Sequence, residues 1–223
     1  YTIPSFHNLI GSVMSLRRRQ ELFRFCTNNG LPIVEDNAYG ELWFDEEPPK
    51  PLKSMDKNGM ILYLGTVSKT LGPGLRIGWL VGPESVVERL GDVKMQIDYG
   101  ASSVSQWMAA EFFSSGLYDE HLTHIRHQLK KRRDIMLSAL NRYFKDLGYW
   151  NIPMGSFYIW LELKHPISTK KLFNEALKEK LLVNPGDIYN FSQNGAIRLS
   201  YAYASEEDLW NGIKKLAKII LRV

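Results

Sequence analysis

The sequence predicts an α/β fold, in which a unit with a mostly parallel sheet and helices is followed by an α+β unit. Three observations lead to this prediction. In the first half of the chain, short apolar strands alternate with helical segments, as in parallel α/β proteins. After Gly148 the order changes to strand, helix, strand and a final amphipathic helix. The 223 residues, of which 44% are hydrophobic, can bury a sizeable core.

Caps, turn residues and apolar spacing mark the elements of the first unit. Ser15 is a favourable N-cap, Asn29-Gly30 ends that helix, and Pro83 suits the first turn of another. Three prolines make residues 45–53 an irregular loop. Short apolar runs predict strands, and apolar residues at three- to four-residue steps predict helices. The expected strands are 31–34, 60–64 and 76–81, and the expected helices are 15–28, 83–97, 102–115 and 119–144.

The second unit is expected to contain strands at 156–163 and 196–201 and helices at 168–180 and 205–221. Residues 1–4 have the character of the end of a strand. Because a parallel sheet needs enough strands with both faces covered, the first unit is either unusually small or part of a longer protein.

The composition excludes several classes of function. The net charge of +4 is too small to indicate nucleic-acid binding by itself. No apolar run reaches the roughly 18 residues of a membrane span, so no membrane partner is expected. A single cysteine, Cys26, and the lack of a recognisable export signal at the start favour a cytoplasmic protein.

Two basic runs, a histidine series and a glycine cluster are interpreted as structural. Residues 17–19 and 130–133 are expected on solvated helix faces. The histidines at 121, 124 and 127 drift about 60° around a helix at each step, so no metal site is expected there. In residues 72–78 the third glycine comes one position late for a dinucleotide-binding loop, and no helix opens there.

The strongest chemical signal follows the second strand. Hydroxyl residues and a lysine lie in Gly65-Thr66-Val67-Ser68-Lys69, and Arg76 follows after a Gly/Pro loop. Hydroxyls and loop N–H groups can hold a phosphate, and arginine adds a two-pronged charged contact. A lysine made nucleophilic by burial or by a neighbouring cation can form a Schiff base. A lone lysine after a strand is usually an ordinary surface residue, so the interpretation depends on the whole pattern.

This pattern resembles the lysine motif of fold-type I pyridoxal-phosphate enzymes, the class I/II aminotransferases, in which S-x-S-K and a loop precede R-x-G. Three further pieces occur in the order of that family: His7-Asn8-Leu9-Ile10-Gly11 in place of N-P-T-G, then Asp36-x-x-Tyr39, then Arg198-Leu199-Ser200-Tyr201. The resemblance covers essentially the whole chain. It implies that residues 1–140 are the C-terminal half of a large pyridoxal-phosphate-binding domain and that residues 141–223 are the small C-terminal domain.

The resemblance also implies pyridoxal 5′-phosphate as cofactor and Lys69 as the catalytic residue. Lys69 then carries the Schiff base and moves a proton during amino-group transfer from an amino acid. Asp36 pairs with the pyridine nitrogen, which keeps the ring an electron sink. Arg198 binds the α-carboxylate of the substrate with its planar fork. The implied cofactor-binding residues are Asn8, Asp36, Tyr39, Thr66, Ser68, Lys69 and Arg76.

Some features depart from the family pattern. Leu9 and Ile10 replace the Pro and Thr of N-P-T-G, and Thr66 stands where Ser is usual. The earlier half of the family's fold, with a glycine-containing phosphate turn, an aromatic residue that stacks on the ring and a tyrosine from the dimer partner, has no counterpart in these residues. A homodimer is expected from the resemblance.

Two functions of the parent protein fit the resemblance. The segments 36–44, 95–100 and 198–204 are similar to MocR-type regulators of the GntR class, in which an aminotransferase-like domain senses an amine or amino acid behind a DNA-binding domain. We favour this function, with nucleic acid bound only through an upstream domain outside these residues. The alternative is a free-standing aminotransferase of the aminoadipate/lysine type. A purely structural interaction module has no sequence feature in its favour.

Overall fold

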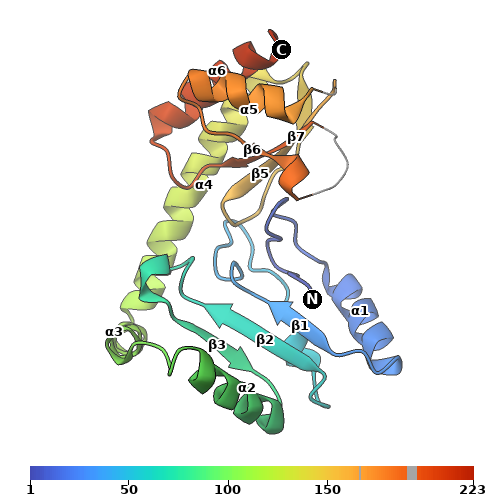
Figure 1. Ribbon diagram of the computed structural model, residues 1–223, viewed down its shortest axis with the longest axis vertical. Helices are drawn as coiled ribbons and strands as arrows, with labels where there is room; N and C mark the ends of the chain where they lie inside the picture. The colour runs from blue at the N-terminus through green and yellow to red at the C-terminus, as the bar shows by residue number, and fades with distance from the viewer. Residues whose placement is uncertain (166, 190–194) are drawn as a thin grey trace. The chain divides into compact units, whose positions relative to one another are not determined.

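A computed structural model describes residues 1–165, 167–189 and 195–223, and their contacts form two compact units (Figure 1). Unit 1 comprises residues 1–7 and 12–126, and unit 2 comprises residues 8–11 and 127–223. The division falls inside the long helix α4 (Leu117–Tyr143). The domain boundary at residue 140 stays a prediction.

The sheet of unit 1 has the strand order β1-β2-β3. Its strands are β1 (Ile33–Asp36), β2 (Ile61–Thr66) and β3 (Gly78–Val81). β1 and β2 are parallel, whereas β3 runs antiparallel to β2. Thr2 forms a parallel bridge with Glu35, so the first residues run beside β1 as their strand character predicted.

Four helices belong wholly or partly to unit 1, and each lies close to its predicted position. They are α1 (Leu16–Asn28), α2 (Glu84–Ile97), α3 (Ser103–Ser114) and the first part of α4. Ser15 caps α1 as predicted, because its side chain accepts a hydrogen bond from the Arg18 N–H at 3.4 Å. α1 and the short 3-10 helix Leu52–Met55 cover the core residues Ile33 and Ile61 of the sheet. No helix in the described ranges is long and apolar enough to cross a membrane.

Arg19 of α1 is fully buried. Its guanidinium donates hydrogen bonds to the carbonyls of Pro4, Met14 and Lys50 and to the Ser5 hydroxyl, at 2.9–3.2 Å. The sequence placed this arginine on a solvated helix face, and that prediction is wrong because carbonyls of three segments converge on the side chain. Arg19 therefore ties α1 to the N-terminal segment and to the proline-rich loop.

Glu35 is a second fully buried charged residue. Its two carboxylate oxygens accept hydrogen bonds from the N–H groups of Leu52 and Lys53, both at 2.8 Å. Burial raises the pKa of Glu35, while these two donors and the charges of Arg19 and Lys53 oppose the rise. The carboxylate thus anchors the 3-10 helix to β1, one residue before Asp36.

Asp56 organises the turn that leads into β2. Its carboxylate accepts hydrogen bonds from the backbone N–H groups of Asn58, Met60 and Ile61 at 3.0–3.2 Å, and one oxygen lies 2.9 Å from the Lys53 Nζ. Burial raises the pKa of Asp56, but the Lys53 ammonium and the three N–H donors outweigh it and lower the pKa to about 2. The turn therefore depends on an ionised carboxylate.

We expect this turn to make the fold sensitive to acid. Because the pKa of Asp56 is lower in the folded chain than the ordinary 3.8, its stabilisation is complete above that value and is lost as the pH falls toward about 2. Asp56→Asn should cost about 2 kcal/mol at neutral pH and flatten the pH dependence of the unfolding free energy below about pH 5. Urea unfolding at a series of pH values measures both. Asp92→Asn, at an exposed side chain of α2, is the control, and an equal effect in it contradicts the prediction.

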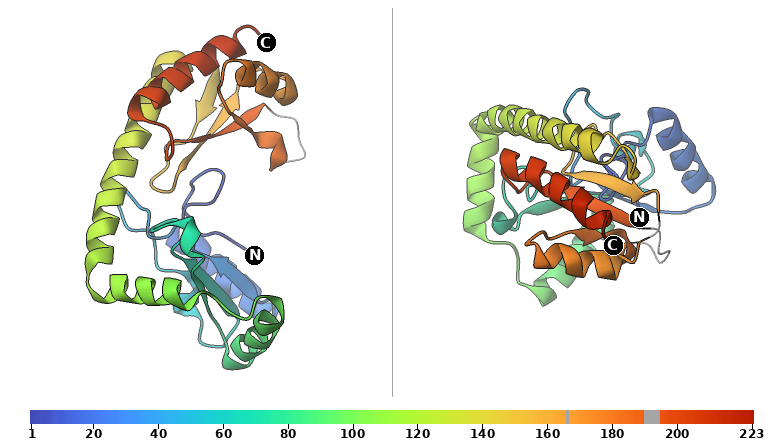
Figure 2. Two further views of the ribbon diagram at one scale, coloured as in Figure 1. Left: turned by 60° about the vertical axis from the view of Figure 1, so that its left-hand side comes forward. Right: turned by 90° about the horizontal axis from the view of Figure 1, so that it is seen from above.

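Unit 2 contains a four-stranded antiparallel sheet with the order β4-β5-β7-β6. Its strands are β4 (Gly148–Trp150), β5 (Tyr158–Leu163), β6 (Asn184–Pro185) and β7 (Ala196–Ser200). The helices α5 (Thr169–Lys178) and α6 (Glu206–Ile220) pack against each other (Figure 2). β5, β7, α5 and α6 lie where the sequence predicted them, whereas β4 and β6 were not predicted.

The two faces of this sheet differ. Ile159 and Leu161 of β5 and Ile197 of β7 are completely buried. Trp160 and Arg198, which are paired across the two strands, point to the opposite face and are half-buried. This alternation leaves a polar, accessible face on which Arg198 is presented.

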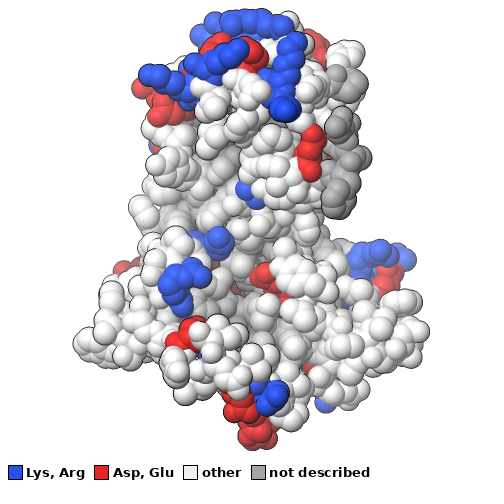
Figure 3. Space-filling model, in the orientation of Figure 1, with Lys and Arg blue, Asp and Glu red and all other residues white. Residues whose placement is uncertain are grey.

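Charged side chains of both signs cover the helices of unit 2. Figure 3 shows Lys and Arg gathered over α5 and α6 with acidic residues among them, and Arg222 lies 3.0 Å from Glu179. Arg133 of α4 differs, because it is 6% exposed and donates a hydrogen bond to the Pro153 carbonyl at 2.9 Å. The expectation of a solvated face over 130–133 is therefore wrong for Arg133.

Candidate functional site

Lys69 lies in a turn directly after β2. The N–H groups of Leu71 and Gly72 donate to the Val67 carbonyl at 2.8 and 3.2 Å and close this turn. Lys69 is half-buried, and its Nζ lies 5.7 Å from the centroid of the Tyr39 ring. No carboxylate of the described residues forms an ion pair with this ammonium group. The turn thus presents an amine beside an aromatic ring.

The loop that carries Lys69 is closed at its base by Thr66. The Thr66 hydroxyl donates to the Ile77 carbonyl at 2.8 Å, and the Val67 N–H approaches the same oxygen at 3.3 Å. The Ser68 N–H donates a hydrogen bond to the Thr66 hydroxyl oxygen at 3.1 Å. The Ser68 hydroxyl oxygen lies 3.0 Å from the same Thr66 oxygen. The two hydroxyls and the lysine therefore share one compact loop between antiparallel strands.

Arg76 ends the same loop in a left-handed backbone conformation, with φ +55° and ψ +36°. This conformation is unusual for a residue with a side chain. One guanidinium nitrogen donates to the Pro73 carbonyl at 3.0 Å. The residue is otherwise exposed, so its remaining N–H donors face outward from the loop.

Gly65 and Trp79 form a cross-strand pair at the start of the loop. A Cβ atom on Gly65 would lie 2.3 Å from the indole ring, so the ring lies directly on the glycine. Only glycine permits this contact. The contact fixes the position of Trp79, three residues after Arg76.

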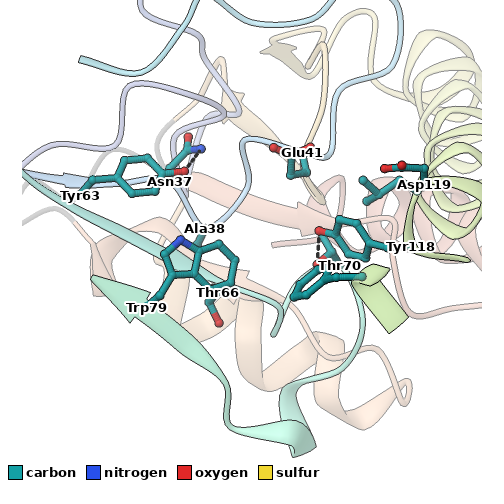
Figure 4. A pocket seen from close by; sticks show the side chains of 11 residues that line it. Asn37, Ala38, Glu41, Tyr63, Thr66, Thr70, Trp79, Tyr118 and Asp119 are labelled. Atoms are coloured by element: carbon teal, nitrogen blue, oxygen red, sulfur yellow. Dashed lines mark hydrogen bonds between the residues drawn. The ribbon is translucent and has the colours of Figure 1, made fainter. Parts of the chain in front are cut away.

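The residue after Lys69 is held by α4. The Thr70 hydroxyl accepts a hydrogen bond from the Tyr118 hydroxyl at 3.2 Å, and the Thr70 carbonyl lies 2.7 Å from the His121 Nε2. A cavity of about 320 Å³ lies beside this contact, lined also by Asn37 and other residues of unit 1 (Figure 4). The contacts of Thr70 join the Lys69 turn to a helix within the same unit.

Asp36 is the last residue of β1. Its Oδ1 accepts a hydrogen bond from the Ala38 N–H at 3.0 Å, and its Oδ2 accepts one from the Tyr1 hydroxyl at 2.5 Å. Tyr39 follows in the same turn and is 4% exposed. Unit 1 therefore brings Asp36, Tyr39 and Lys69 to the ends of the neighbouring parallel strands β1 and β2.

Unit 2 holds the other two residues singled out in the sequence. The Arg198 guanidinium donates a hydrogen bond to the Asn8 Oδ1 at 2.8 Å. The rings of Tyr158 and Tyr189 lie 4.2 and 4.8 Å from the guanidinium carbon. The Tyr189 hydroxyl in turn accepts from the Asn184 Nδ2 at 3.0 Å. Two aromatic rings and an amide thus hold Arg198.

The segment 8–11 belongs to unit 2 because its turn packs against residues near β4 and β5. Gly11 has φ +61°, and a Cβ there would lie 2.9 Å from the Pro153 side chain. The Ile10 carbonyl accepts a hydrogen bond from the Asn151 side chain. The glycine of the Asn8 motif is therefore required by its backbone conformation and by a close neighbour.

Three contacts of the predicted residues were not foreseen from the sequence. They are the pairing of Asn8 with Arg198, the rings of Tyr158 and Tyr189 on that arginine, and the hydroxyl of Tyr1 on Asp36. The pairing of Asn8 with Arg198 joins positions 190 residues apart in the chain. The third had a usable signal, because residues 1–4 have strand character and alternation places every second side chain on one face.

Proteins of known family resemble this chain throughout its length. A family model for aminotransferases of class I and II matches residues 2–216. The HTH-type transcriptional regulator YisV of Bacillus subtilis is 55% identical over 223 residues, which are 100% of this chain and 46% of that protein. The HTH-type transcriptional regulator NorG of Staphylococcus aureus is 38% identical over 224 residues, 100% of this chain and 50% of that protein. The chain thus spans about half the length of the curated relatives it matches.

Solved structures show the same fold. Kynurenine aminotransferase of Pyrococcus horikoshii, in complex with PMP, has a TM-score of 0.95 and 34% identity, over 100% of this chain and 55% of that chain. LysN, an α-aminoadipate aminotransferase of Thermus thermophilus, has a TM-score of 0.94 and 30% identity, over 100% of this chain and 58% of that chain. These matches confirm both the predicted fold class and the family resemblance.

Proposed function

Because the chain belongs to the class I and II aminotransferase family, we propose that it binds pyridoxal phosphate at Lys69 and forms the effector-sensing part of a transcriptional regulator. The observation that carries the proposal is the Lys69 loop, in which an amine, the Ser68 hydroxyl and the Arg76 guanidinium are held together on a short, closed segment. Such a loop offers one nucleophile and several donors for an anion.

The residues of unit 1 fit a phosphorylated pyridine aldehyde. Lys69 offers a primary amine, and Ser68 and Arg76 offer donors for a phosphate. The Asp36 carboxylate accepts one hydrogen bond at each oxygen and keeps further lone pairs for a pyridine N–H. Thr66 completes the set, although its hydroxyl donates to the Ile77 carbonyl, so a phosphate contact requires that hydroxyl to turn.

When bound, pyridoxal phosphate supplies an aldehyde and an electron-withdrawing ring that stabilises a carbanion next to an amino group. Lys69 binds the cofactor through Nζ and, when it is free, moves the proton at the substrate Cα. Asp36 holds the proton on the pyridine nitrogen. Tyr39 and Asn8 orient the cofactor at its ring oxygen. The family pattern supports all four roles, and the chemistry of unit 1 supports those of Lys69, Asp36 and Tyr39, since Asn8 belongs to unit 2.

Arg198 is proposed to bind the carboxylate of an amino acid. The rings of Tyr158 and Tyr189 lie beside its guanidinium, with the guanidinium carbon 4.2 and 4.8 Å from their centroids, and Asn8 accepts a hydrogen bond from one nitrogen. The remaining donors lie along the edge of the planar group, which suits the two oxygens of a carboxylate. The proposed ligand is therefore an amino acid. A simple amine could also bind, but it would make no contact with Arg198 through a carboxylate.

The regulatory role is supported by the relatives. YisV and NorG are named HTH-type transcriptional regulators, and they are twice as long as the matching segment. A sensing domain needs only to bind a ligand differently in two conformations, so full turnover is unnecessary. We propose that the parent protein is a cytoplasmic homodimer that contacts DNA through a domain outside these residues.

A free-standing aminotransferase is the second candidate function. It is favoured by the solved aminotransferase structures, which match at TM-scores of 0.94 and 0.95. This alternative shares the cofactor and the role of Lys69. It differs in requiring that an amino acid be converted fully to its keto acid.

The complete protein distinguishes these functions. We expect the complete protein to bind pyridoxal phosphate. The DNA that is recovered with the protein from cells serves as the probe, and we expect an amino acid or amine to change the affinity of the protein for this DNA by about fivefold or more. Turnover should stay below about 1 per second. Turnover at or above that rate without DNA binding would establish the free-standing enzyme. A protein that does not bind the cofactor would overturn both candidates.

A further inference from the structure

Residues 1–3 run parallel to β1, and Thr2 fixes their register. The Thr2 N–H donates to the Val34 carbonyl, and the Thr2 carbonyl accepts from the Asp36 N–H, both at 2.9 Å. These bonds pair Thr2 with Glu35. Because side chains alternate along a strand, Thr2 and Glu35 point to one face of the sheet while Tyr1 and Asp36 point to the other. The backbone itself therefore places the phenol beside the carboxylate.

The Asp36 carboxylate is held at both oxygens. The Tyr1 hydroxyl donates to Oδ2 at 2.5 Å, and the Ala38 N–H donates to Oδ1 at 3.0 Å. Two donors that approach different oxygens restrict rotation of the carboxylate about its bond to Cβ. An ionised carboxylate has about four acceptor positions, so each oxygen keeps a free lone pair.

The phenol is a donor across the whole working range of pH. Desolvation of its hydroxyl and the adjacent Asp36 carboxylate raise the pKa of Tyr1 to about 12, even though 77% of the residue is exposed. The hydroxyl therefore keeps its proton at neutral pH and in mild alkali. Its hydrogen bond to the carboxylate does not depend on the titration of the phenol near neutrality.

We infer that Tyr1 is a positioning residue, whose hydroxyl orients the Asp36 carboxylate toward the pyridine nitrogen of the cofactor. The inference rests on the proposed function, because Asp36 must be the partner of that nitrogen. A carboxylate fixed before the cofactor arrives loses less freedom on binding, so the interaction is stronger than with a freely rotating side chain. Tyr1 acts through Asp36 and does not itself touch the reacting atoms.

The test compares Tyr1→Phe with wild type in the complete protein. The substitution keeps the ring and removes only the hydroxyl. We expect the affinity for pyridoxal phosphate to fall about tenfold, the effect of losing a hydrogen bond to a charged group. We also expect the ¹⁵N resonance of cofactor labelled at the pyridine nitrogen to shift, because the carboxylate facing it has lost a donor and its fixed orientation.

Tyr63→Phe is the matched control. Tyr63 is another tyrosine of the same sheet, and its hydroxyl accepts a hydrogen bond from the Asn37 Nδ2 at 2.9 Å without touching Asp36. This variant should leave both the affinity and the ¹⁵N resonance unchanged. An equal loss of affinity in Tyr63→Phe would show a general loosening of unit 1 and would overturn the inference.

Borohydride trapping on Lys69 separates this inference from the proposed function. If Lys69 is labelled in wild type and in Tyr1→Phe, and the affinity and the ¹⁵N resonance are unchanged, the inference on Tyr1 is overturned while the proposed function stands. If wild type does not label Lys69, both are overturned. Labelling of Lys69 with the expected tenfold loss and ¹⁵N shift in Tyr1→Phe alone supports the inference.

Discussion

Lys69→Ala is expected to abolish covalent retention of pyridoxal phosphate by the complete protein and to lower any amino-group transfer by about 10²–10⁴-fold. The reason is that this residue supplies both the amine that binds the cofactor and the group that moves the proton. The turn itself should persist, because it is closed by backbone bonds to Val67 and not by the lysine side chain.

The measurement is reduction of the cofactor-loaded protein with borohydride, followed by peptide mass spectrometry. The label should map to Lys69 in wild type and be absent from Lys69→Ala. Lys57→Ala, at an exposed lysine before β2, is the control and should be labelled at Lys69 as strongly as wild type. A label on another lysine would contradict the assignment of Lys69 as the residue that binds the cofactor. It would also contradict the roles of Asp36 and Arg76, which depend on that assignment.

Arg198→Lys is expected to weaken binding of α-amino acids by about 10–100-fold while binding of pyridoxal phosphate stays within about threefold. Lysine keeps the positive charge but loses the planar fork that meets both carboxylate oxygens. It also loses the planar group whose carbon lies 4.2 and 4.8 Å from the centroids of the Tyr158 and Tyr189 rings.

A panel of amino acids and matched simple amines provides the readout. Binding is followed by the absorbance change of the cofactor in the complete protein. Amines without a carboxylate should bind the variant and wild type equally. Arg222→Lys, at an exposed arginine of the same unit, is the control. It should change the binding of neither the amino acids nor the amines. An equal loss for amines and amino acids in Arg198→Lys would assign the arginine a structural role.

Elements with strong local signals could be predicted from the sequence. Ser15 caps α1 because its hydroxyl meets the Arg18 N–H, an interaction between residues three positions apart. The Lys69 loop is equally local, since its hydroxyls, glycines and arginine lie within one short segment. β4 and β6 were missed because strands of three and two residues have too few positions to show alternation.

The interactions that depend on tertiary structure could not be predicted. Arg19 and Arg133 were expected to be solvated because they lie in basic runs, yet carbonyls from distant segments hold both side chains in the interior. The contact between Asn8 and Arg198 spans 190 positions of the chain. Helical or strand periodicity carries no information about which distant group meets a given side chain.

The left-handed backbone of Arg76 has an energetic consequence for the fold. This conformation costs a residue with a Cβ about 1 kcal/mol or more, and it costs glycine almost nothing. Selection for folding alone would therefore favour glycine at this position. Arg76 is exposed, and within the described residues its guanidinium donates a hydrogen bond to the Pro73 carbonyl, which offsets little of that cost. The proposed phosphate contact would supply the favourable interaction that this strained position otherwise lacks.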